Sequence, residues 1–73
     1  MTYDPSDAVI QRLVLLLRSG DPATRRNAAG ALRLNGARAL PALSELTHLL
    51  DDDDPLVQHE ARRAIERLRT VAA

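Results

Sequence analysis

The chain has 73 residues, enough for one small domain. Ten arginines balance ten acidic residues, there is no lysine, and Tyr3 is the only aromatic side chain. Because the sequence contains no cysteine, disulfide bonds and thiolate metal sites are excluded. The core must be built from Leu, Ile, Val and Ala, which suits closely packed helices and offers few large anchors for a nucleobase.

Neither the N-terminal residues nor the apolar runs indicate export or membrane insertion. The longest purely apolar run, Leu13 to Leu17, is far shorter than the roughly 20 residues that span a bilayer. The opening Met-Thr-Tyr-Asp-Pro has no basic region and no signal-peptide pattern. We therefore expect a cytoplasmic protein with no membrane contact.

Proline, glycine and aspartate divide the chain into four predicted helices, at about 5–18, 22–35, 38–50 and 55–70. Asp-Pro pairs open the first, second and fourth, because Asp caps the N–H groups of the first turn and Pro at the next position needs no donor. Gly20 and Gly36 are expected to supply the left-handed conformation that stops a helix. Pro41 is placed in the first turn of the third helix, where no intrahelical donor is needed.

Apolar residues recur at helical spacing in all four segments, and no stretch alternates with the period of a strand. The predicted fold class is therefore all-α. The first and third segments share a leucine-rich stripe, and the second and fourth share an alanine-rich one. The expected core positions are Ile10, Leu13, Leu16, Leu17, Ala28, Ala31, Leu32, Leu43, Leu46, Leu49, Leu50, Ala61, Ala64, Ile65 and Leu68.

The sequence repeats itself with a period of 33 residues, in one register across both helices of each half. A fixed period of this length is the signature of a stacked helical array. We expect a single domain over 1–73, with repeat one at about 5–36 and repeat two at about 37–70. The matched positions include Asp21-Pro22 with Asp54-Pro55, and Ala28, Ala31 and Leu32 with Ala61, Ala64 and Ile65.

The pattern L-x-x-L-L, a short turn, D-P-x-V-R and then x-x-A-x-x-A-L-x-x-L-G resembles the short bacterial HEAT-like repeat, a type also seen in phycobilin-lyase-related proteins. The resemblance covers nearly the whole chain and implies two helical hairpins stacked as a short α-solenoid. Three residues depart from it, Thr24, Asn35 and Gln58, where the pattern favours Val, Leu and Arg. Only Arg25 can therefore contribute to the family's Asp–Arg ladder between repeats, reaching Asp54 or the acidic stretch beside it.

The second and fourth segments together carry a charge of +5. The resemblance implies that these second helices line a concave face, which should therefore be basic. Arg26, Arg33, His59 and Arg63 are the candidate partner-binding residues on it, suited to an acidic protein segment or a phosphate backbone. The alternative is an ordinary solvated face with pairs such as Arg62–Glu66.

Three apolar residues of the first repeat, Val14, Leu15 and Leu34, have polar counterparts in the second. They are candidates for a surface that another chain covers. The alternative is a wide core stripe packed by the residues around Tyr3.

The sequence predicts no catalytic or metal constellation. The acidic run 51–54 lacks the spacing of a calcium loop, and His48 and His59 lie on different helices without ligand spacing. Glu45 and His48 are three residues apart, but we expect them on an exposed face without a pocket. We expect no metal, no cofactor and no enzymatic activity.

These observations predict a non-catalytic protein-interaction module that binds a protein partner or a second copy of itself. We expect either self-association or a compact four-helix arrangement helped by a partner, because two repeats are fewer than the roughly three that make a stable stack. One alternative is polyanion or nucleic-acid binding through the arginine-bearing helices, against which zero net charge and the lack of stacking aromatics argue. Another is an accessory subunit of a chromophore-lyase-like enzyme, by family analogy.

Overall fold

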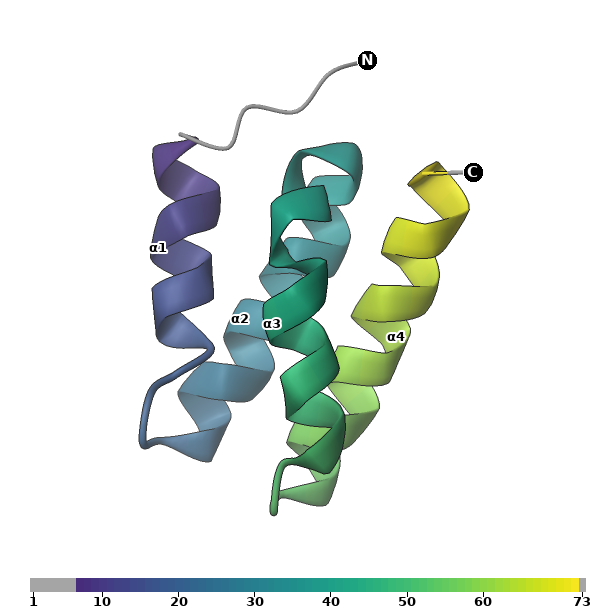
Figure 1. The fold of residues 1–73 in the computed structure, drawn as a ribbon. Helices are drawn as coiled ribbons and strands as arrows, with labels where there is room; N and C mark the ends of the chain where they lie inside the picture. The colour runs from purple at the N-terminus through teal and green to yellow at the C-terminus, as the bar shows by residue number, and fades with distance from the viewer. Residues whose placement is uncertain (1–6, 73) are drawn as a thin grey trace.

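The computed structural model describes residues 7–72, which form helical rods joined by short turns (Figure 1). Successive rods run in alternating directions, and the molecule measures 34 × 23 × 17 Å. The all-α prediction is confirmed. The elements in chain order are α1 (Ala8–Leu16), α2 (Pro22–Asn35), the 3-10 helix η1 (Gly36–Ala42), α3 (Leu43–His48), the 3-10 helix η2 (Leu49–Asp51) and α4 (Pro55–Ala72).

Asp-Pro pairs begin α2 and α4 as predicted. Asp21 Oδ2 accepts hydrogen bonds from the Thr24 backbone N–H at 3.3 Å and from its hydroxyl at 2.7 Å. Asp54 Oδ1 accepts from the N–H groups of Leu56 and Val57, at 2.8 and 3.2 Å. Each aspartate thus satisfies a donor that the first turn of a helix leaves free.

The first helix differs from its predicted bounds of 5–18. It begins at Ala8, with Asp7 as its cap, and ends at Leu16. The predicted start at Asp4-Pro5 lies outside the described residues. The predicted left-handed stop at Gly20 is wrong, because Gly20 does not have a positive φ. Gly36, the other glycine predicted to stop a helix, has a φ of 60°. At the end of α1 the N–H groups of residues 18 and 19 bond the carbonyls three residues back, so this tightened turn needs no left-handed residue.

The predicted third helix, 38–50, is one rod but not one α-helix. Pro41 lies inside η1, and α-helical winding begins only at Leu43. Because the proline ring clashes with the carbonyl four residues earlier, a 3-10 winding precedes it. The rod still buries an apolar stripe: Ala39, Ala42, Leu46 and Leu49.

The core lies between the rods, and α2 packs most extensively against α4. Alanines on both helices allow this close approach. The space beside these alanines is filled by larger, fully buried side chains: Leu32, Leu46, Val57 and Leu68. Among the expected core positions, Leu13, Leu16, Ala31, Leu43 and Leu50 are only partly buried. The core also includes Ala29, Ala39, Ala42 and Val57, which were not among the expected positions.

Candidate partner-binding surfaces

The end of the molecule that carries the α1–α2 and η2–α4 turns is held together by Arg25. Its Nε lies 2.9 Å from Asp52 Oδ2 and its Nη2 lies 3.1 Å from Asp52 Oδ1, while Nη1 donates to the Ser19 carbonyl at 2.8 Å. The two charged side chains are only 14% and 8% exposed. This bidentate pair confirms that Arg25 reaches the acidic stretch, with Asp52 rather than Asp54 as its main partner.

The pair also sets the protonation of its members. Burial raises the pKa of Asp52, but hydrogen bonds from Arg25 and from the Asp54 N–H outweigh burial and leave that pKa below its ordinary value. The bond to Asp52 raises the pKa of Arg25. Gln58, which stands where the repeat pattern favours Arg, donates to the Asp52 carbonyl.

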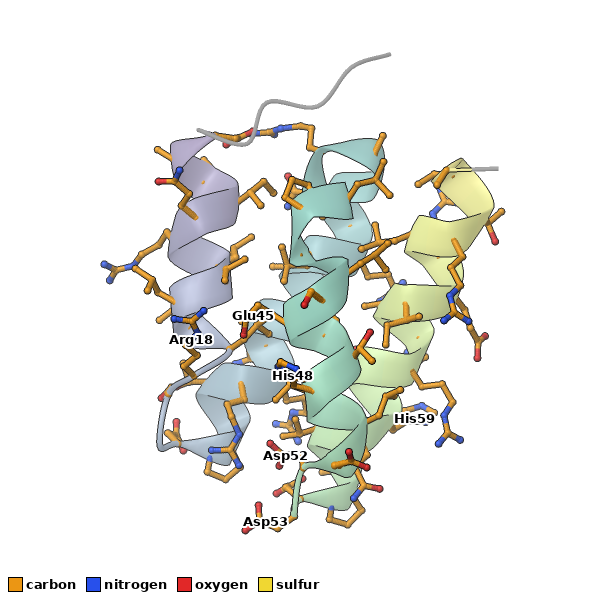
Figure 2. The ribbon with its side chains drawn as sticks, viewed as in Figure 1. Arg18, Glu45, His48, Asp52, Asp53 and His59 are labelled. Atoms are coloured by element: carbon orange, nitrogen blue, oxygen red, sulfur yellow. The ribbon has the colours of Figure 1, made fainter. Side chains whose placement is uncertain are left out.

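Three residues of the acidic run, Asp52 to Asp54, make structural contacts. Asp52 binds Arg25, Asp54 caps α4, and Asp53 is 97% exposed with one oxygen 3.6 Å from Arg25 Nη2 (Figure 2). Within residues 7–72, no three His, Asp or Glu side chains are grouped in a way that could hold a metal ion.

Two further arginines join elements distant in sequence. Arg18 Nη2 lies 2.5 Å from Glu45 Oε1, linking the turn after α1 to α3 (Figure 2). This bond lowers the pKa of Glu45, which is therefore committed to an ion pair rather than poised beside His48 as a base. Arg38 Nη2 lies 2.8 Å from Asp7 Oδ2, and its Nη1 donates to Asn35 Oδ1 at 3.2 Å.

A second surface lies between α2 and α4 and is built differently. An open hollow of about 440 Å³ follows one side of α2, and we call it the α2–α4 groove. Both apolar and charged side chains line it. Its lining residues are Arg26, Asn27, Gly30, Ala31, Arg33, Leu34 and Glu60.

The carboxylate in the α2–α4 groove already has a cation. Glu60 Oε1 lies 3.3 Å from Arg63 Nη1, and the Glu60 side chain is only 17% exposed. By contrast, Arg26 and Arg33 make no hydrogen bond or ion pair with any other residue in the range 7–72. The groove therefore presents two guanidinium groups that have no carboxylate partner within the described residues.

One hydrogen-bond donor of Arg33 has no acceptor in the described part of the chain. This donor is the Nε, which is shielded from solvent. A buried donor left without a partner typically costs about 1–3 kcal/mol. A carboxylate is an acceptor suited to this donor, since Nε and a terminal nitrogen of arginine bind carboxylates as a pair.

The structure gathers some of the predicted binding residues and separates others. Arg26, Arg33 and Leu34 share the α2–α4 groove, whereas Arg63 contacts it only through Glu60. His59 is exposed on α4 and is not part of the lining (Figure 2). The predicted pair Arg62–Glu66 is not the one formed on α4, where Arg63 bonds Glu60 instead.

The other two apolar candidates lie elsewhere. Val14 and Leu15 line a separate hollow of about 380 Å³ together with Ile10, Gln11 and Pro41. Leu15 is 60% exposed and Leu34 is 78% exposed, so each offers apolar surface on a different side of the molecule.

Sequence reasoning missed Glu60, Gly30 and Asn27 as members of the groove. The signal was present in the repeat, because Glu60 stands 33 residues after Asn27 and so occupies the equivalent position on the neighbouring helix. Gly30 brings α2 close to that carboxylate, since a Cβ on residue 30 would lie 3.5 Å from Glu60 Oε2.

Antiparallel helical rods that recur with matched caps and alanine stripes define an all-α helical-repeat protein. The family model for HEAT repeats matches residues 2–73, and the chain therefore belongs to the HEAT repeat family. Modules of this family commonly mediate protein interactions and are typically scaffolds without catalysis. No curated protein and no solved structure matches the chain. Within residues 7–72, no helix is both long and apolar enough to cross a membrane.

Proposed function

We propose that this HEAT-repeat chain is a non-catalytic protein-interaction module, built as two stacked helical hairpins at about 5–36 and 37–70, which binds a protein partner in the α2–α4 groove. The observation that carries the proposal is the position of Leu34. This side chain is 78% exposed and lies beside two arginines that have no carboxylate partner among the described residues. Exposed apolar surface next to arginine is typical of protein-binding sites.

The other exposed apolar residues support a covered surface in a second place. Val9 (52%) and Leu15 (60%) lie on α1, and Leu56 (55%) lies on the first turn of α4. A second copy of the chain is the partner suited to these residues, because a small two-repeat unit buries a limited fraction of its surface. Self-association is therefore part of the proposal.

Site-specific photocrosslinking in the source cell tests the proposal. A photoreactive phenylalanine analogue replaces Leu34, and a matched variant carries it at Thr70, which is exposed on α4 outside the groove. We expect a discrete protein adduct from position 34 that is absent from position 70, and the isolated pair should re-form from purified components. If position 34 gives no protein adduct, or the same adducts as position 70, the proposed binding surface is wrong.

The mass of each adduct separates the possible partners. An adduct of two 8.0 kDa chains identifies self-association. Light scattering after size exclusion checks this independently, and a strict monomer at micromolar concentration with a cooperative melt removes the self-association part.

A further inference from the structure

We infer that the α2–α4 groove recognises an acidic segment of a partner protein, with two carboxylates that bind Arg26 and Arg33 and an apolar side chain that covers Leu34. This inference rests on the proposed function, because it names the chemistry of the partner at the same surface. It follows from the contrast in pairing within the groove. Glu60 is neutralised by Arg63, while the guanidiniums of Arg26 and Arg33 have no partner in the described part of the chain.

The charge balance of the groove favours an anion. The lining residues and Arg63 together contribute three guanidiniums and one carboxylate. Arg33 adds a directional requirement, because its shielded Nε lacks an acceptor and carboxylate oxygens are the geometrically matched partners of that donor.

The spacing of the two arginines limits the partner further. Arg26 and Arg33 are seven residues apart on α2, which separates their backbone positions by about 10 Å along the helix axis. Two acidic residues seven positions apart on a partner helix match this distance. So do acidic residues three apart in a polyproline-like extended segment, which advances about 3.1 Å per residue.

A phosphate backbone fits the same groove less well. Nucleic acids are held by a track of several cations along the chain of phosphates. Here the largely buried Glu60 carboxylate lines the same groove as the two arginines and interrupts the basic surface. The short, interrupted site with exposed Leu34 at its edge suits a peptide that supplies both acidic and apolar side chains.

Selection from a displayed random peptide library, on the full chain in low salt, tests the inference. Matched variants carry equal charge changes: Arg26→Gln with Arg33→Gln in the groove, and Arg12→Gln with Arg69→Gln on exposed positions outside it. Circular dichroism confirms that both fold. Neither groove arginine contributes a bond within residues 7–72, and Arg33→Gln removes the shielded Nε that lacks an acceptor, so we expect the groove variant to melt no lower than the wild type.

We expect the selected peptides to carry at least two Asp or Glu residues at one of the spacings above, together with an apolar residue. Their affinity should fall at least tenfold on the groove variant and by less than twofold on the control variant, and it should weaken as salt is raised. Peptides without acidic residues, equal binding to the two variants, or a selection without binders above background would overturn the inference. Tighter binding of a 12-base-pair DNA duplex than of any selected peptide would overturn it as well.

The failure of this inference is distinguishable from failure of the proposed function. If position 34 crosslinks a partner whose binding does not depend on Arg26 and Arg33, the interaction surface stands and its acidic chemistry is wrong. If position 34 crosslinks no protein, the surface itself is wrong.

Discussion

Adjacent residues of α2 belong to two regions that treat positive charge in opposite ways. Arg25 is held between Asp52 and the Ser19 carbonyl at the end of the molecule, with a side chain that is only 14% exposed. Arg26 points into the α2–α4 groove and has no partner among the described residues. The number of arginines on a helix therefore does not indicate how many of them are free to bind a partner. The paired arginine joins two turns, whereas the guanidinium of the unpaired arginine has no acceptor within the described residues.

The largest expected effect tests the core beneath both regions. Leu32 is fully buried and Leu34, two residues further along α2, is 78% exposed. Leu32→Ala should lower the free energy of unfolding by about 2–5 kcal/mol through lost contacts and the cavity that remains. Leu34→Ala should change it by less than about 0.5 kcal/mol. Urea denaturation followed by circular dichroism measures both, and similar losses would show that Leu34 packs in the core.

The next effect separates the two neighbouring arginines. Arg25→Ala should destabilise the fold clearly, because it leaves the shielded Asp52 carboxylate without its cation. Arg26→Ala should change the free energy of unfolding by less than about 0.5 kcal/mol. Thermal melts of the two variants provide the comparison. If both lower the melting temperature equally, the distinction between paired and unpaired regions is wrong.

Acid should reduce the stability that the paired carboxylates contribute. The folded-state pKa values of Asp52 and Glu45 lie below their ordinary values of 3.8 and 4.5. Their contribution to stability is therefore complete above the ordinary values and is lost as pH falls through the lower folded-state values. Unfolding free energy should be flat from pH 6 to 5 and then decline, with a shallower decline in Arg25→Ala. An equally steep decline in that variant would mean that other carboxylates dominate.

The smallest expected effect concerns Gly30, which lines the α2–α4 groove. Gly30 lies in the interior of α2 without a positive φ, so Gly30→Ala should raise the free energy of unfolding by about 0.5–1 kcal/mol. The new methyl group would make an ordinary contact at 3.5 Å with Glu60 Oε2. Chemical denaturation measures the change, and a loss of stability would show that α2 and α4 approach too closely for a side chain.

The sequence was sufficient for features that depend on neighbouring residues. The Asp21 and Asp54 caps act on donors two and three residues away, so local chemistry predicted them. The 3-10 winding around Pro41 and the stop of α1 before Gly20 were not predictable in this way. Each depends on a competition between two helical windings that differ little in local preference.

The candidate surface was predictable only in part for a similar reason. Helical spacing placed Arg26 and Arg33 on one side of α2, and the repeat register placed α4 beside them. Whether they have partners depends on Glu60, whose carboxylate bonds Arg63 on its own helix instead of crossing to α2. Which of several nearby cations a carboxylate binds depends on its rotamer and not on its position in the sequence.

The arginine Nε–Hε signals, followed by nuclear magnetic resonance while a selected acidic peptide is added, test the proposed binding site most directly. We expect the signals of Arg26 and Arg33 to move with the titration, while that of Arg25, already bonded to Asp52, stays in place. Equal movement of Arg25, or no movement of Arg26 and Arg33 on binding, would contradict the claim that the unpaired arginines of the α2–α4 groove form the binding site.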